Sequence, residues 1–125
     1  MEVKDLMIKK VHTVKEDDDI KVACKLLTRH RISGIPVISK SGKLKGFISE
    51  RDIIAAVPRT NFCNLKVKNL MSKRVRTIPH DAPVTHASKI FSQEKYRLLP
   101  VTKGTKLVGI IARKDIVKQM IGRYY

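Results

Sequence analysis

Two short polar segments contain the residues whose types and spacing could do chemistry. Ser49-Glu50-Arg51-Asp52 follows one apolar run, and Ala112-Arg113-Lys114-Asp115 follows another. A hydroxyl at the end of a strand, with a carboxylate three residues later on a helix, can form a capping box. The same arrangement can bind a ligand, because the free N–H groups of a helix N-terminus attract phosphate and a carboxylate can accept both hydroxyls of a ribose. The two interpretations are compatible.

The second segment bears on the choice between them. It lacks the hydroxyl, since Ala112 stands where Ser49 stands in the first segment, but it keeps the aspartate. Without the hydroxyl the capping box cannot form, and an aspartate that served only the box would not be needed. The retention of Asp115 therefore favours a separate role for its carboxylate. We therefore expect a ligand to use Asp52 and Asp115, with Ser49 and Asp52 forming the better site.

The two segments are matching parts of a unit that is written twice. VKDLMIKKVHTV (residues 3–14) aligns with VKNLMSKRVRTI (67–78) at an offset of 64, and Pro36-Val37 aligns with Pro100-Val101. One residue is then deleted, and residues 43–53 align with 106–116 at an offset of 63. Such self-similarity indicates a repeated structural unit. We divide the chain into a first repeat, 1–60, and a second repeat, 61–125, which together form one module.

The spacing of apolar residues and turn residues in each repeat predicts the order β-α-β-β-α. The first repeat predicts strands at 11–14, 35–39 and 44–49 and helices at 19–30 and 50–57. The second predicts strands at 75–78, 99–103 and 107–112 and helices at 83–94 and 113–121. Asp17 or Asp18 and Asp81 suit the N-caps of the longer helices, and the acidic run 16–19 suits a helix dipole better than a metal.

A single repeat is too small to bury both faces of its sheet. We therefore expect the two copies to pack sheet to sheet about a pseudo-twofold axis and to share one core. Such packing would leave two equivalent clefts between the copies. The short segments that lead into each repeat could serve the opposite copy, and the sequence does not assign this crossing.

The composition indicates one soluble, cytoplasmic module. The chain has 125 residues, 42% of them hydrophobic, and no apolar run of the roughly 18 residues that a membrane helix needs. Its N-terminus lacks the apolar region of a signal peptide, so we expect no membrane association. Cys24 and Cys63 lack CxxC spacing, and the histidines show no ligand spacing. We expect one core cysteine and one connector cysteine rather than a zinc site or a disulfide.

The charge is strongly positive, with 27 Lys and Arg against 11 Asp and Glu, a net charge of +16. Residues 1–60 carry 13 basic and 8 acidic residues, net +5, and residues 61–125 carry 14 and 3, net +11. Such a surface attracts polyanions, including nucleotides, nucleic acid and anionic lipid. The alternative is a solvated basic surface with no specific partner.

Taken together, these segments resemble a tandem pair of CBS domains (a Bateman module) in a stand-alone CBS-domain protein. The resemblance covers residues 3–122 and rests on VKDLM and VKNLM, on GIPV (34–37) and LLPV (98–101), and on GFISERDI (46–53) and GIIARKDI (109–116). It implies a mixed α/β (α+β) fold of two tandem β-α-β-β-α repeats, packed sheet to sheet with pseudo-twofold symmetry.

The resemblance also implies a regulatory adenosyl-ligand site for AMP, ADP, ATP or a compound of the S-adenosylmethionine type, with no cofactor. The serine and aspartate segment would contact phosphate and ribose, and the Gly-apolar-Pro strand would offer its backbone to the base. A threonine of each lead-in segment and the arginine three residues before the second proline would lie near the ligand. The implied ligand-binding residues are Thr13, Gly34, Ile35, Pro36, Ser49, Asp52, Thr77, Arg97, Leu99, Pro100 and Asp115.

Structural explanations exist for several of these residues. Thr13 and Thr77 are good strand formers, the two prolines suit edge strands, and Arg97 could be a solvated surface residue. Two departures from the family pattern fall in the second repeat. Ala112 lacks the hydroxyl, and Leu98 replaces a glycine, so we expect the cleft built on Asp115 to bind more weakly, to bind another ligand or to stay empty.

The predicted function is that of a sensor that binds an adenosine-containing small molecule and signals to a separate, unknown regulated protein. We expect no enzyme activity, because the sequence has no nucleophile and base pair, phosphate-binding loop or metal constellation. We expect a homodimer, because both closing helices have an apolar face. The alternative function is nucleic-acid binding through the basic surface, which the few aromatic residues and the absence of a recognition motif disfavour.

Overall fold

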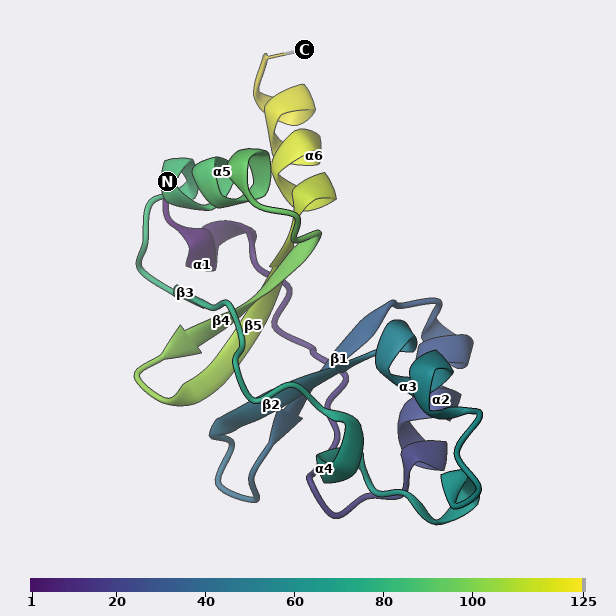
Figure 1. Cartoon of the computed structure of the whole chain (residues 1–125). Coiled ribbons are helices and arrows are strands. Elements are labelled where there is room, and N and C mark those ends of the chain that lie inside the picture. Colours follow the sequence, from purple (N-terminus) through teal and green to yellow (C-terminus); the bar gives the residue numbers. More distant parts are fainter. Residues whose placement is uncertain (125) are drawn as a thin grey trace. The chain divides into compact units, whose positions relative to one another are not determined.

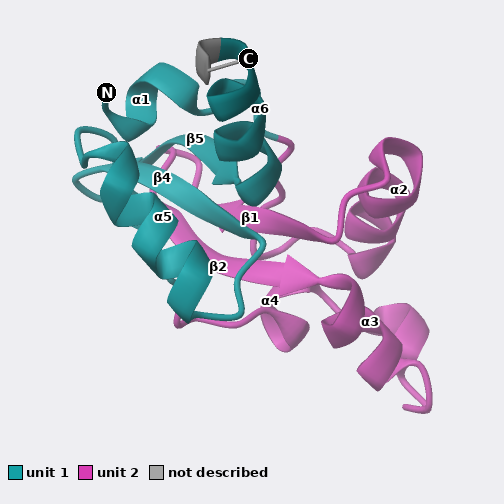
Figure 2. Cartoon of the chain, turned by 90° about the horizontal axis from the view of Figure 1, so that it is seen from above, with its two compact units in different colours: residues 1–11, 76–125 teal, residues 12–75 magenta. Residues whose placement is uncertain are grey.

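A computed structural model describes residues 1–124, and the side chains of residues 1–122. The chain forms two compact units (Figure 2). Unit 1 combines Met1–Val11 with the chain from Arg76 onward, and unit 2 is His12–Val75. Each unit therefore takes a segment with a four-residue α-helix from the opposite repeat, residues 1–11 in unit 1 and 61–75 in unit 2. These are called the lead-in segments below, and they make the crossing that the sequence left unassigned.

Unit 2 is built around an antiparallel hairpin of β1 (Gly34–Ile38) and β2 (Leu44–Ser49). The hairpin is preceded by α2 (Ile20–His30) and followed directly by α3 (Glu50–Ala56). A 3₁₀ turn (Phe62–Asn64) and α4 (Val67–Leu70) complete this part of the chain (Figure 1). Apolar residues at helical spacing on α2, Ala23 and Leu27, pack on Ile35, Val37 and Ile48 of the hairpin.

Unit 1 repeats this arrangement around β4 (Leu98–Lys103) and β5 (Lys106–Ala112). The short strand β3 (Ile78–Pro79) pairs in parallel with β4. The helices are α1 (Val3–Leu6), α5 (Val84–Gln93) and α6 (Arg113–Tyr124) (Figure 1). Ala87, Ile90 and Phe91 of α5 pack on the buried side chains of the strands, which include Leu99 and Ile111.

The elements of the mixed α/β fold lie within a few residues of the predicted ranges, but the first predicted strand of each repeat is shorter than predicted. In 11–14 only Val14 pairs, with Val37, and in 75–78 only Ile78 belongs to a strand. The four-residue helices α1 and α4 were not predicted. The buried residues cluster within each unit, so each unit has a core of its own.

The predicted N-caps were wrong. The N-cap residues are Asp19 for α2 and Pro83 for α5, and neither side chain caps its helix. The acidic run instead holds α4, because Asp17 accepts a 2.9 Å hydrogen bond from Lys68 Nζ and Asp19 accepts one of 2.7 Å from Lys66 Nζ. Hydrogen bonding to these ammonium groups lowers the pKa of both carboxyl groups below the ordinary value of 3.8.

The lead-in segments approach the hairpins closely at two repeat-matched glycines. In unit 2 Phe47 and Ser72 exchange backbone hydrogen bonds of 2.8 and 2.9 Å, and in unit 1 Ile8 and Ile110 do the same. A Cβ atom added at Gly46 would lie 2.6 Å from the carbonyl oxygen of Ser72, which is too close for any side chain. Gly46 is therefore required by the neighbouring backbone, whereas a Cβ atom at Gly109 would first meet the side chain of Met7, at 2.6 Å, and the carbonyl oxygen of Ile8 at 3.0 Å.

No helix within residues 1–124 is both long and apolar enough to cross a lipid bilayer.

Replacing Gly46 by alanine should destabilise the protein by about 2 kcal/mol, because the backbone of Ser72 would have to move away from β2. Gly122→Ala is the matched control, since no atom lies within 4 Å of a Cβ there and alanine favours the helix by less than about 1 kcal/mol. Urea denaturation of both variants measures the difference. Equal stability of the two variants would contradict the assigned role of Gly46.

Candidate ligand-binding site

The turn from β2 into α3 forms a complete capping box. The N–H and the Oγ–H of Ser49 donate to Oδ2 of Asp52 at 2.8 and 2.9 Å, and the N–H of Asp52 donates to Ser49 Oγ at 3.3 Å. Both residues are half-buried. All the hydrogen bonds that Asp52 accepts within the described residues end on Oδ2, so Oδ1 is the oxygen left to accept a ligand hydroxyl.

The turn from β5 into α6 keeps half of this arrangement. The N–H of Ala112 donates to Oδ2 of Asp115 at 2.8 Å, although there is no hydroxyl to complete the box. Asp115 therefore has a structural role beside Ala112, and our argument that half of a capping box would not need its carboxylate was wrong. Its retention does not by itself indicate ligand binding.

The same backbone-to-side-chain bond occurs at the start of both four-residue helices. Glu2 N–H donates to Asp5 Oδ2 and Lys66 N–H donates to Asn69 Oδ1, each at 2.8 Å. An asparagine oxygen thus caps a helix of this protein as well as an aspartate oxygen does. This equivalence allows the charge and the capping role of Asp52 to be tested separately.

The Gly-apolar-Pro strands lie directly beside these turns. Gly34 is the register partner of Ser49, and the carbonyl of Ser33 accepts the N–H of Glu50 at 2.9 Å. The side chains of Ile35 and Pro36 are completely buried, as is that of Leu99 in the second repeat. The exposed fraction of each of these residues includes its backbone, so in this structure these residues offer no exposed group to a ligand.

Thr13 and Thr77 occupy equivalent positions, each in the same unit as the hairpin of its own repeat. Val14 pairs in parallel with Val37 and its N–H donates to the carbonyl of Pro36, so Thr13 lies beside the end of β1. Ile78 pairs in the same way with Val101, which places Thr77 beside Pro100. Both threonines are half-buried. The structure thus gathers Thr13, Gly34, Pro36, Ser49 and Asp52 in unit 2.

In unit 1 the structure brings Arg97 next to Ala112. The carbonyl of Arg97 accepts the N–H of Arg113 at 3.0 Å, and Leu98 is the register partner of Ala112. The Arg97 side chain is exposed. Thr77, Arg97, Leu99, Pro100 and Asp115 therefore belong to one unit, although the buried side chain of Leu99 cannot contact a ligand.

The sequence analysis missed the part that Phe47 plays. A Cβ atom at Gly34 would lie 2.3 Å from the ring of Phe47, so the aromatic ring covers the glycine that precedes Ile35. Leu98 occupies the glycine position in unit 1, opposite Ala112. The contact follows from the strand register, because pairing of Gly34 with Ser49 places Gly34 and Phe47 on neighbouring strands two residues apart in register.

The uneven charge of the two repeats disappears in the folded units. Unit 1 contains 13 Lys or Arg and 5 Asp or Glu, and unit 2 contains 14 and 6, so each has a net charge of +8. The exchange of the lead-in segments moves basic residues from the second repeat to unit 2 and from the first repeat to unit 1. The electrostatic attraction for anions is therefore similar in the two units.

Within the described chain, no group of three or more His, Cys, Asp or Glu side chains could hold a metal ion. His12 and His30, which lie far apart in the sequence, stack with ring centroids 3.7 Å apart. Both cysteines are free thiols, with Cys63 exposed and Cys24 half-buried in the edge of the core, where burial raises the pKa of its thiol.

The family model of the CBS domain matches the chain twice, at residues 3–59 and 67–122. A CBS domain-containing protein of Dictyostelium discoideum is 33% identical over 95% of this chain and 90% of its own length. Homoserine O-acetyltransferase of Methanosarcina acetivorans is 30% identical over 98% of this chain. The chain spans only 22% of that enzyme, which is about a fifth of its length.

Solved structures with the same fold include ligand complexes. CBSX2 in complex with AMP superposes with a TM-score of 0.87 at 26% identity and covers 99% of this chain and 98% of its own. The CBS domain pair of protein MJ0100 in complex with 5′-methylthioadenosine and S-adenosyl-L-methionine superposes with a TM-score of 0.81 at 30% identity, with 98% of each chain covered.

Asp115→Ala should lower the free energy of unfolding by about 1 kcal/mol, because the N–H of Ala112 loses its acceptor. Asp115→Asn should retain most of that free energy, as Asn69 caps α4 in the same way. Thermal or urea denaturation distinguishes the variants. If alanine and asparagine were equally destabilising, the carboxylate charge rather than the hydrogen bond would carry the role of Asp115.

Proposed function

We propose that this chain, which belongs to the CBS domain family, is a regulatory module that binds an adenosine-containing ligand and needs no cofactor. The observation that carries the proposal is the Ser49 and Asp52 turn, where Oδ1 of the carboxylate is left without a hydrogen bond among the described residues. A free carboxylate oxygen can accept a ribose hydroxyl. At the start of α3 the N–H groups of Glu50 and Asp52 are engaged by Ser33 and Ser49, which leaves that of Arg51 for a phosphate. The ligand complexes of CBSX2 and of the MJ0100 pair support this ligand class.

We rank the site of unit 2 above that of unit 1. The first contains Thr13 and the hydroxyl of Ser49, beside the buried residues Gly34 and Pro36. The second lacks the hydroxyl, but Thr77 and the exposed Arg97 are available to a ligand. Arg97 could pair with a phosphate oxygen, so the second site would favour a ligand with more negative charge.

We propose that ligand occupancy is passed to a separate protein by a population shift. A ligand that binds one arrangement of the protein more tightly than another changes the fraction of molecules in each. This mechanism requires no catalytic residue, and we assign no enzyme activity to the chain. The acetyltransferase activity of the M. acetivorans relative belongs to a protein of which this chain spans 22%.

Nucleic-acid binding is the second candidate function, and the net charge of +8 on each unit favours it. A polynucleotide would bridge many lysines, and its affinity would fall steeply with salt because each neutralised phosphate releases a counterion. A mononucleotide makes few such contacts, so its affinity would fall much less. The two functions therefore differ in a quantity that a titration measures.

We propose that the protein forms a homodimer through α3 and α6. Ile54 and Val57 on α3 are 66% and 56% exposed, and Val117 and Ile121 on α6 are 58% and 56% exposed. Cys24, Leu27 and Ile53 line a hollow of about 400 Å³ between α2 and α3 beside Ile54. Large apolar side chains exposed in a row on a helix indicate an interaction surface.

Ile54→Lys combined with Val117→Lys should convert a dimer to a monomer, because both charges would have to be buried at the interface. Multi-angle light scattering measures the molar mass. Val22→Lys is the control, since Val22 is 41% exposed on α2 and lies outside the proposed surface. A monomeric wild-type protein, or dissociation by Val22→Lys, would contradict the proposal.

Asp52→Asn should weaken the binding of AMP, ATP or S-adenosylmethionine by about tenfold and leave the fold intact, because the asparagine oxygen keeps the cap while the charge that a ribose hydroxyl prefers is lost. Asp115→Asn should have a smaller effect. Calorimetric titration of both variants at two salt concentrations, with a short oligonucleotide in parallel, measures these affinities.

Two outcomes would contradict the proposal. Absence of heat with every nucleoside ligand at micromolar to millimolar concentration would remove the sensor function, and tight oligonucleotide binding with a steep salt dependence would favour the nucleic-acid function instead. Equal losses for Asp52→Asn and Asp115→Asn would contradict the ranking of the two sites.

A further inference from the structure

Unit 1 contains a basic hollow of about 350 Å³ at the hairpin end of its sheet, lined by Lys4, Asp5, Met7, Lys9, His80, Lys103 and Val108. It is separate from the turn that carries Asp115. Val108 lies near the β4–β5 turn and Ala112 at the opposite end of β5, about 13 Å away at 3.3 Å per residue. Neither the repeat motifs nor the proposed adenosyl site uses this hollow.

Backbone hydrogen bonds hold the basic residues around the hollow. Lys4 N–H donates to the carbonyl of His80 at 2.8 Å, and His80 N–H donates to the carbonyl of Thr102, the neighbour of Lys103, at 2.9 Å. The pairing of Ile8 with Ile110 fixes the position of the adjacent Lys9. Three segments that are distant in the sequence thus meet at one depression, and two of them bring the ammonium groups of Lys4, Lys9 and Lys103 to it.

The positive charge at the hollow is only partly neutralised. Lys4 forms an ion pair with Glu2 at 3.1 Å, and Oδ2 of Asp5 is engaged by the N–H of Glu2. Among residues 1–122, the ammonium groups of Lys9 and Lys103 form no ion pair. Met7 and Val108 add apolar side chains to the lining, and charges beside apolar groups attract an anion more strongly than charges in open water.

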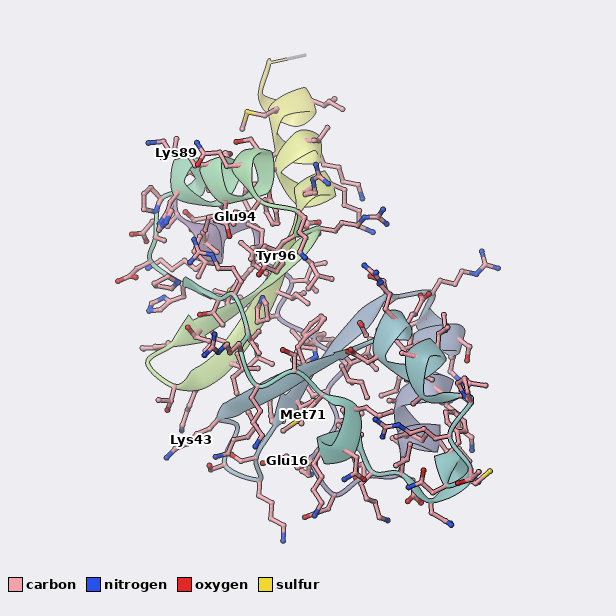
Figure 3. The ribbon with its side chains drawn as sticks, in the orientation of Figure 1. Glu16, Lys43, Met71, Lys89, Glu94 and Tyr96 are labelled. Atoms are coloured by element: carbon pink, nitrogen blue, oxygen red, sulfur yellow. The ribbon has the colours of Figure 1, made fainter. Side chains whose placement is uncertain are left out.

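The matching region of unit 2 has the same backbone and different side chains. Lys68 N–H donates to the carbonyl of Glu16 at 2.9 Å, as Lys4 does to that of His80. Unit 2 has Glu16 and Ser39 where unit 1 has His80 and Lys103, and Lys68 is bound to Asp17. It also has Asn69 and Lys45 where unit 1 has Asp5 and Val108. Figure 3 labels Glu16 and Met71 in this region. The two sets of residues therefore carry the same formal charge, and unit 1 differs in the positions of its lysines.

We propose that this hollow binds a small anion with linked phosphate groups. Its volume lies at the lower end of the range of small-molecule pockets, which suits a di- or triphosphate group. Lysine ammonium groups on separate segments can each contact a different phosphate. This proposal does not depend on the proposed adenosyl site. The phosphate groups belong either to a free inorganic polyphosphate or to the tail of a nucleotide.

Titration of the full chain with inorganic tripolyphosphate at low salt, followed by calorimetry and by NMR of the backbone amides, tests the proposal. The amides of Lys4, Lys9, His80 and Lys103 should shift. Lys9→Met combined with Lys103→Met should weaken binding by about tenfold, because each exposed charge pair contributes a few-fold.

The control is Lys73→Met combined with Lys43→Met in unit 2. Lys73 matches Lys9 in the repeat, and Lys43 lies at the β1–β2 turn as Lys103 lies at the β4–β5 turn. This control removes the same total charge and should change the affinity by less than about twofold. An equal loss in both double variants, or amide shifts that avoid the lining residues, would overturn the proposal.

Two further arms identify the source of the phosphates and separate this proposal from the adenosyl site. If ATP shifts the same four amide signals and AMP does not, the hollow binds the phosphate tail of a nucleotide. If only tripolyphosphate shifts them, the hollow binds a free inorganic anion. Asp52→Asn should leave the tripolyphosphate affinity unchanged. A loss of nucleoside binding in Asp52→Asn with retained tripolyphosphate binding supports two independent sites, whereas loss of both would overturn the independence of the hollow.

Discussion

The backbone pairing of each lead-in segment with the hairpin of the opposite repeat is the contact on which the rest of the structure depends. The paired hydrogen bonds between Phe47 and Ser72 and between Ile8 and Ile110 bring α4 to unit 2 and α1 to unit 1. They require glycine at position 46, where a Cβ atom would lie 2.6 Å from a backbone oxygen. They also equalise the charge of the units and bring Lys4 and Lys9 to the basic hollow.

The fold was predictable from the sequence wherever a local pattern decided the structure. Helical spacing of Ala23 and Leu27 predicted α2, and short apolar runs about a glycine turn predicted both hairpins. The crossing of the lead-in segments was not predictable, because residues 3–7 and 67–71 differ at one position and either could pair with either hairpin. Asp17 and Asp18 do not cap α2, because Asp17 pairs with Lys68 and Asp18 accepts the N–H of Lys15.

The local hydrogen bonds at the candidate site were predictable from the sequence, but the contacts between distant segments were not. The sequence predicted the capping box of Ser49 and Asp52, since its spacing is local. It gave a misleading reason for Asp115, because one backbone N–H is enough to keep a carboxylate at a helix start. The ring of Phe47 over Gly34 depends on strand register, and the basic hollow depends on three distant segments. Neither leaves a local pattern.

The exchange of lead-in segments has a consequence for the origin of the chain. A single repeat contains a short helix whose partner strand lies in a second repeat, so one copy alone leaves the edge of its hairpin and its own short helix unpaired. Two identical single-repeat chains could satisfy both by reciprocal exchange between molecules. Gene duplication and fusion would then turn an intermolecular exchange into an intramolecular one, after which the two copies were free to diverge in their charged residues.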